Sequence, residues 1–322
     1  MSKKAVKIAL LCAGFFLVLF SFARNEAAEK IRYANHFKPT PFYGLPAIAA
    51  VEKGFFKEKG LEVSYAGFDS PSLMGRAMAS GDLDVGTYGL DTAVFTIVRK
   101  TPIVLIGDPK MPVPFALWVL KNSPLKEPGQ LKGARIGVTG QAELPRRLVD
   151  QLLPKIGMDI KDVKYIGTGG GPPGVAALRS GAVDASSFSF YAMVALKARG
   201  EVRELLYITD HIPSGRTAQT IMANRAFAEK NKEQAKKVVE GFMQGAAFVL
   251  ANKAWSTEKM KSDFRYSDAA ADLAFAMFRY GKDGRISPQT IKESVDYLIS
   301  VGDISRTDAP PLESIYLKEM AE

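Results

Sequence analysis

Two stretches that lie one hundred positions apart decide the fold: Ser80-Gly81-Asp82-Leu83-Asp84-Val85-Gly86-Thr87-Tyr88 and Ser180-Gly181-Ala182-Val183-Asp184-Ala185-Ser186-Ser187-Phe188. Each follows a short amphipathic segment that we expect to be helical. In each, the glycine suits the left-handed position that ends a helix, a brief apolar strand follows, and hydroxyl-bearing residues lead to an aromatic one. The repetition predicts two similar halves built from the same α/β unit.

The residues before each copy also correspond. In both halves a strand-like run is followed by a loop, a helical segment that ends at Gly60 or Gly157, and a second strand-like run. These elements are 31–34, 46–59 and 61–65 in the first half, and 135–138, 145–156 and 163–166 in the second. Because parallel strands require crossover helices, the pattern predicts two α/β lobes, with the ligand site at the carboxyl ends of the strands.

The rest of the chain is expected to connect and cover these lobes. Strand-like runs at 115–121 and 219–223 follow proline or glycine breaks, and we interpret them as two segments that cross between the lobes. Beyond them the pattern is helical, with Ser267 or Asp268 capping a helix that ends at Gly281 and Ser287 capping another. We expect these helices to cover the first lobe and to pack their aromatic and methionine residues, including Phe275, Met277 and Phe278, in the core.

The N-terminus has the pattern of a cleaved leader. Lysines within the first seven residues precede an uncharged apolar run at 8–20, and the small residues Ser21 and Ala23 predict a signal peptide of residues 1–23. The run is shorter than the roughly 18 to 20 residues of a membrane span, so an uncleaved anchor is the less favoured alternative. Cleavage removes three lysines and the single cysteine, and the formal charge falls from +9 to +6. We therefore expect a periplasmic monomer with no stable membrane insertion after cleavage.

Composition narrows the function classes. The 322 residues are 47% hydrophobic and 24% charged, which is typical of a globular protein with two domains and excludes wholesale disorder. One cysteine, Cys12, and two histidines, His36 and His211, exclude most thiolate zinc sites and any three-histidine centre, so we predict neither metal nor cofactor. Lysines and arginines are dispersed among acidic residues, which argues against nucleic acid as a partner.

Further stretches carry a resemblance to a known family, and together they are specific to a fold and not to a ligand. They are Glu52-Lys53-Gly54-Phe55-Phe56 with Gly60-Leu61-Glu62-Val63, the segment 80–86, Leu131-Lys132-Gly133-Ala134-Arg135-Ile136-Gly137-Val138, and Ala177-Leu178-Arg179-Ser180-Gly181-Ala182-Val183-Asp184-Ala185. Through them nearly the whole chain after the leader resembles the periplasmic solute-binding proteins of ABC importers, in the branch that handles nitrate, sulfonates, taurine and thiamine pyrimidine precursors.

The resemblance implies the type II periplasmic-binding-protein fold, an α/β fold of two lobes. Each lobe is expected to hold a mostly parallel sheet flanked by helices, with two crossing segments between them. We expect residues 24–113 and 225–322 to form the first lobe and residues 114–224 the second. The resemblance also implies a solute held between the lobes and delivery of the closed form to an ABC permease and its ATPase.

The spacing of Gly169, Gly171 and Gly174 matches a dinucleotide-binding motif, but the residues argue against that function. Pro172 and Pro173 lack the backbone N–H groups that would hold phosphate, and no acidic residue follows at the spacing of about 20 that ribose binding needs. We interpret the motif as a tight loop whose following helix offers its N-terminal N–H groups to a solute.

The loops at the carboxyl ends of the predicted strands supply the candidate ligand-binding residues. For each aromatic candidate core packing is the alternative, for His36 a surface or packing role, and for Asp69 and Asp91 a helix cap. The candidates are His36, Phe42, Tyr43, Asp69, Ser70, Tyr88, Asp91, Thr139, Gln141, Gly169, Gly170, Gly171, Phe188, Ser189 and Tyr191.

These residue types favour a small organic solute over inorganic nitrate. Flat aromatic walls suit a ring or an alkyl body, and carboxylates would bind an amine or a ring N–H. Hydroxyls and helix N-termini could instead hold a sulfonate or carboxylate, with Arg146 or Arg147 as counter-charge, although we expect both arginines to be exposed. Sulfonate, carboxylate and pyrimidine-like solutes all stay open.

Two other functions are alternatives. An enzyme on the same fold could act on a pyrimidine or aromatic substrate, but there is no Gly-x-Ser-x-Gly nucleophile motif, and the cysteine-rich motif of the thiamine-pyrimidine enzyme in this broad family is absent. We therefore predict no enzyme. A sensory binding protein that docks a receptor is the other alternative.

Overall fold

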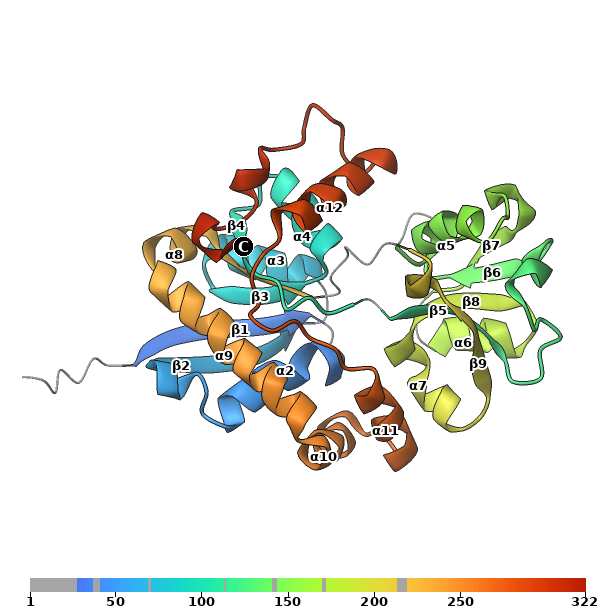
Figure 1. Cartoon of the computed structure of the whole chain (residues 1–322), viewed down its shortest axis with the longest axis horizontal. Coiled ribbons are helices and arrows are strands. Elements are labelled where there is room, and N and C mark those ends of the chain that lie inside the picture. Colours follow the sequence, from blue (N-terminus) through green and yellow to red (C-terminus); the bar gives the residue numbers. More distant parts are fainter. Residues whose placement is uncertain are drawn as a thin grey trace, which may run out of the picture.

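A computed structural model of the chain describes residues 28–36, 41–68, 71–112, 114–140, 144–169, 172–212 and 219–322 (Figure 1). The predicted signal peptide, residues 1–23, lies outside these ranges. None of the helices within them is long and apolar enough to cross a membrane. The described residues form an α/β structure of two lobes, each built around a mixed sheet of five strands.

The sheet of the first lobe has one parallel and one antiparallel part. Its order is β2 (Leu61–Phe68), β1 (Glu29–His36), β3 (Val85–Tyr88), β10 (Thr220–Asn224) and β4 (Ile103–Gly107). β1 runs parallel to β2 and β3, whereas β10 is antiparallel to both of its neighbours. Its helices are α2 (Pro41–Glu52), α3 (Pro71–Ser80), α4 (Leu90–Val98), α8 (Arg225–Lys230), α9 (Lys232–Ala251) and α12 (Pro288–Ser300).

The sheet of the second lobe repeats this arrangement. Its order is β7 (Lys164–Gly167), β6 (Arg135–Val138), β8 (Ala185–Ser189), β5 (Phe115–Leu120) and β9 (Val202–Tyr207). β6 is parallel to β7 and β8, and β5 is antiparallel to β8 and β9. The helices α5 (Leu144–Lys155), α6 (Pro172–Arg179) and α7 (Phe190–Ala198) belong to this lobe.

The repeated sequence has the same structural role in both lobes. Gly81 and Gly181, with φ of 80° and 72°, end α3 and α6 in the left-handed conformation that glycine adopts without strain. Asp84 and Asp184 accept hydrogen bonds from an arginine of the neighbouring strand: Arg32 Nη2 donates to Asp84 at 2.6 Å, and Arg135 Nη2 donates to Asp184 at 2.7 Å. The backbone N–H of each arginine also donates to that carboxylate, at 2.8 Å. Each aspartate thus fixes the central parallel strand of its lobe.

The predicted crossing strands exist, but they belong to the sheets. β5 lies between β8 and β9, and β10 lies between β3 and β4. The chain crosses instead between β4 and β5, in the first crossing segment that begins at Asp108, and returns between η4 (Ile208–Asp210) and β10. The predicted end of the second lobe at 224 was wrong because the chain has rejoined the first sheet by Thr220. Burial of Ile221, Met222 and Ala223 between the layers accounts for their apolar pattern.

The expectation that all C-terminal helices cover the first lobe was partly wrong. α9 packs along α2, α12 packs along α4, and α10 (Lys253–Phe264) contacts both α2 and α9, as expected. In contrast, α11 (Asp268–Ala276) contacts α10 and also α7 of the second lobe. The buried residues Met260, Ala274 and Phe278 share one apolar cluster with Trp118 and Phe190. The cap prediction at Ser267 was right, since its hydroxyl accepts from the N–H of Ala270, although α11 ends at Ala276 rather than near Gly281.

Candidate functional site

The carboxyl ends of the parallel strands in the two lobes lie near one another. Tyr43, in the first turns of α2, follows β1 of the first lobe, and Tyr191, in the first turn of α7, follows β8 of the second. Burial raises the pKa of Tyr191, and the nearby hydroxyls of Tyr280 and Tyr43 raise it further. Burial also raises the pKa of Tyr43, to about 12. Side chains from both lobes therefore meet at the edge where sheets of this kind bind ligands.

Aromatic rings surround this meeting point. The ring of Tyr191 lies 5.7 Å from that of Phe190, edge to face, and 6.2 Å from that of Phe278. Tyr280 follows α11, and its ring stacks on Phe278 at 6.0 Å. The sequence patterns did not point to Tyr280, because nothing in its neighbourhood indicates that α11 approaches the second lobe.

Gln219 adds a buried amide at the same edge. Thr220 pairs with Tyr88 at the end of β3, so Gln219 lies just beyond that strand. Its Nε2 donates to the carbonyl of Tyr43 at 2.7 Å, and the side chain is fully buried. Oε1 has no hydrogen-bond partner among the described residues. If the amide were flipped, its oxygen would face the carbonyl oxygen of Tyr43, so the geometry favours the orientation described. In that orientation Oε1 of Gln219 is a buried acceptor that a solute could satisfy.

Hydroxyl groups lie at the corresponding edge of the second sheet. Thr139 follows β6, and its buried Oγ1 has no hydrogen-bond partner in the part of the chain that the structure describes. Ser189 is the N-cap of α7, but its side chain makes no capping hydrogen bond. Gly169, after β7, has a φ of 72°, which a glycine accommodates at this turn. These groups can donate to or accept from a polar solute.

The two aromatic residues that end the repeated sequence are placed differently from our expectation. Tyr88 is 1% exposed and packs below α3, where a β-carbon on Gly75 would be 2.8 Å from its hydroxyl oxygen. Phe188 is 3% exposed and packs in the same way below α6, against Gly174. Both were candidate ligand contacts, but each is a core residue because its ring fills the space between sheet and helix.

Asp91 is engaged within the first lobe. It lies in the first turn of α4, and one of its carboxylate oxygens accepts from Ser294 Oγ of α12 at 2.6 Å. This contact favours the structural alternative, since it joins two helices of one lobe.

Both arginines of α5, which we expected to be exposed, are only partly exposed and lie in ion pairs, so neither is available as a counter-charge. Arg147 forms a two-pronged ion pair with Asp303, in which Nη2 lies 2.6 Å from Oδ1. Asp303 follows α12, so this pair joins the second lobe to the first, with both side chains less than a quarter exposed. Arg146 contacts Asp150 at 3.5 Å and lies over the ring of Tyr165.

Several candidates lie outside the described residues. They are Asp69, Ser70, Gln141, Gly170 and Gly171, and the side chains of His36 and Phe42 are also not described. His36 is the last residue of β1. His211 is exposed, beside the short helix η4 (Ile208–Asp210). Among the described residues no group of three or more His, Cys, Asp or Glu could hold a metal ion.

The fold is that of the periplasmic binding proteins. The periplasmic aliphatic sulphonate binding protein SsuA from Escherichia coli matches with a TM-score of 0.74 at 18% identity, over 91% of this chain and 97% of that one. The periplasmic nitrate-binding protein NrtA from Synechocystis PCC 6803 matches with a TM-score of 0.67 at 13% identity, over 92% of this chain and 87% of that one. At such identities the likeness concerns the fold alone.

Sequence comparison gives the family. The pattern of the family described as NMT1/THI5 like matches residues 42–254, and the chain belongs to this family. A 4-amino-5-hydroxymethyl-2-methylpyrimidine phosphate synthase of Saccharomyces cerevisiae is 24% identical over 251 residues, which are 71% of this chain and 70% of that protein. The resemblance and the fold class predicted from the sequence are thus confirmed.

Proposed function

We propose that the protein is an exported solute-binding protein that captures a small organic solute between its lobes and delivers it to an ABC permease. The observation that carries this proposal is that Tyr43 of the first lobe packs against the apolar cluster that contains Tyr191 of the second lobe, where each tyrosine follows a strand of its own sheet. A solute between them contacts both lobes and stabilises the closed form, because only a difference in affinity between two states shifts their populations. The ATPase, export to the periplasm and a monomeric state are further parts of the proposal.

Among the possible solutes we favour a flat, neutral heterocycle that carries N–H groups, such as an aminopyrimidine. Tyrosine rings offer it apolar faces, and with a pKa of about 12 the hydroxyl of Tyr43 stays protonated and can donate at neutral pH. A solute N–H would also satisfy Oε1 of Gln219. Arg146 and Arg147 are engaged by Asp150 and Asp303, which makes a sulfonate or carboxylate the second choice.

A thermal-shift screen tests the solute class directly. The purified protein is heated with 4-amino-5-hydroxymethyl-2-methylpyrimidine, butanesulfonate, taurine or nitrate. A ligand at 100 times its dissociation constant stabilises by about 2.7 kcal/mol, and we expect the aminopyrimidine to do so. A response to nitrate alone would contradict the argument from the tyrosines, and a response to butanesulfonate alone would overturn the preference for N–H groups.

Tyr191 provides the matched mutational test. Loss of a stacking ring costs roughly 1–3 kcal/mol, so Tyr191→Leu should weaken the affinity for the stabilising solute by about tenfold or more. Tyr191→Phe, which keeps the ring, should retain most of the affinity. The control is Tyr165→Leu, because Tyr165 lies on β7 and bonds to Asp150 inside the second lobe. Equal affinities for Tyr191→Leu and the control, measured by calorimetry on folded protein, would place the solute elsewhere.

A second candidate is an enzyme on the same fold, which the name of the yeast relative favours. A binding protein releases its ligand unchanged, whereas an enzyme alters it. Mass spectrometry of the solute before and after prolonged incubation with the protein separates the two. A changed mass or a modified protein would replace our proposal with the enzymatic one.

A further inference from the structure

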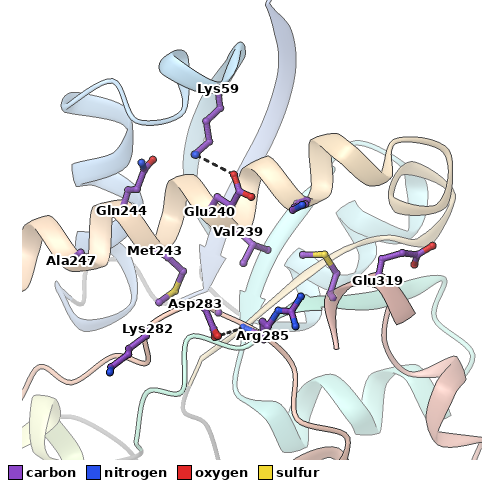
Figure 2. A pocket seen from close by; sticks show the side chains of 13 residues that line it. Lys59, Val239, Glu240, Met243, Gln244, Ala247, Lys282, Asp283, Arg285 and Glu319 are labelled. Atoms are coloured by element: carbon purple, nitrogen blue, oxygen red, sulfur yellow. Dashed lines mark hydrogen bonds and ion pairs between the residues drawn. The ribbon is translucent and has the colours of Figure 1, made fainter. Parts of the chain in front are cut away.

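The first lobe has an open groove, and none of the tyrosines between the lobes lines it (Figure 2). Its volume is about 490 Å³, which lies within the range of small-molecule sites. One wall is α9, and the other is the segment 282–285 that leads to α12. All of its lining residues belong to elements of the first lobe.

The floor of the groove is apolar. Val239 and Met243 of α9 are 3% and 7% exposed and lie on the side of the helix that faces the segment 282–285. Met320, near the C-terminus, is 8% exposed and contributes to the same floor. Ala247, which is exposed, lies further along α9 and lines one end of the groove.

The acidic and the basic side chains on the rim of the groove differ in whether they have ion-pair partners. Each of the acidic lining residues has a partner: Glu240 pairs with Lys59 at 3.1 Å, Asp283 accepts from the N–H of Arg285 at 3.0 Å, and Glu319 pairs with Lys232. In contrast, the side chains of Lys236, Lys282 and Arg285 form no ion pair with any described residue. Figure 2 shows Lys282 at one end of the groove and Arg285 between it and Glu319.

From this combination we infer a second binding site, for a small anion with an alkyl or aryl body. The unpaired cations hold the charged head, since charge-assisted hydrogen bonds to carboxylate, sulfonate or phosphate are the strong ones. The body lies on Val239 and Met243 and removes their remaining exposed surface from water. A cation or a fully polar ion would use only one of these two features.

The groove also touches the connection between the lobes. The carbonyl of Gly284 accepts from the N–H of Asp108 at 2.8 Å, and the N–H of Gly281 donates to the carbonyl of Pro109 at 2.7 Å. Asp108 and Pro109 belong to the first crossing segment. An occupant of the groove therefore lies against a wall that is bonded to that segment.

Calorimetry with octanoate, 1-octanol and acetate tests the proposal. Octanoate carries both the charge and the body, 1-octanol only the body, and acetate only the charge. We expect octanoate to bind at least about tenfold more tightly than either, with an affinity that falls as salt is added. Equal binding of octanoate and 1-octanol would overturn the role of the cations, and equal binding of octanoate and acetate the role of the floor.

Variants then locate the site. Lys282→Glu combined with Arg285→Glu should weaken octanoate binding about tenfold, and Ala247→Trp should weaken it by filling the end of the groove that Ala247 lines. Lys237→Glu is the matched control, because Lys237 is exposed on α9 but does not line the groove. If the control weakens binding equally, or if Tyr191→Leu abolishes it while the groove variants do not, the proposed site is wrong. Binding to vesicles of anionic phospholipid without binding to octanoate would overturn it in favour of a membrane surface.

Discussion

Gly174 is explained by packing. A β-carbon at this position would lie 2.3 Å from Cζ of Phe188 and 2.9 Å from the carbonyl oxygen of Gly169. Gly75 stands in the same relation to Tyr88 in the first lobe. The third glycine of the Gly-x-Gly-x-x-Gly spacing therefore allows α6 to approach an aromatic residue of the repeat, which agrees with the interpretation of this motif as something other than a dinucleotide site.

Gly174→Ala should consequently destabilise the protein. Overpacking of this kind costs about 1–3 kcal/mol, which a lower melting temperature in calorimetry would reveal. Gly129→Ala is the control, because no atom lies within 4 Å of the β-carbon it would add. Adding Phe188→Leu to Gly174→Ala should recover part of the loss, and no recovery would show that the clash with the backbone of Gly169 dominates.

Single positions were the least predictable part of the site. The sequence indicates that Tyr43, Tyr88, Phe188 and Tyr191 all lie at strand ends or helix starts. Whether such a ring faces solvent or the space below a helix depends on which helix covers it, and that depends on contacts distant in sequence. Arg147 was misjudged for the same reason, since its partner Asp303 is 156 positions away.

At the scale of elements, the Arg135–Asp184 pair predicts a dependence of stability on pH. The hydrogen bonds from Arg135 hold the pKa of Asp184 below its usual value of 3.8. A carboxylate with a lowered pKa in the folded state stabilises the fold above pH 3.8, and this contribution is lost as the pH falls through the lowered value. Because more than a third of each side chain is exposed, we expect less than about 1 kcal/mol at neutral pH.

Denaturation of Asp184→Asn across pH measures this contribution. The variant should be less stable than the original protein at pH 7, and the difference should shrink as the pH falls below about 4. Asp210→Asn, at an exposed position of the same lobe, should show no such convergence. A constant difference at all pH values would mean that packing, not charge, is responsible.

The sequence predicted which segments form helices and strands better than it predicted which lobe or layer each of them joins. Hydrophobic alternation, glycine stops and serine caps are local, and they gave the repeated α/β units and the start of α11. Assigning β5 and β10 to crossings, and α11 to the first lobe alone, failed because an apolar strand or helix does not specify which layer it joins. That choice is made by long-range burial, as in the cluster that unites Met260 and Phe278 with Trp118.

At the scale of the whole molecule, the Arg147–Asp303 pair should hold the lobes together without solute. Asp303→Asn removes its charge, so we expect a larger radius of gyration for the unliganded protein in X-ray scattering. Solute affinity should fall by about threefold, because a smaller fraction of molecules is closed before binding. The control is Glu201→Gln, which breaks a pair with Arg179 inside the second lobe. Identical scattering of Asp303→Asn and the control would show that this pair does not hold the lobes together.

The packing of α11 on α7 restricts how the lobes can separate. The chain passes from one lobe to the other between β4 and β5 and between η4 and β10. It passes again between α10, which contacts α2 and α9, and α11, which contacts α7, and returns between α11 and α12. We therefore expect the lobes to separate on the side where α5 approaches the end of α12. A solute would then enter and leave on that side, where Asp303 pairs with Arg147.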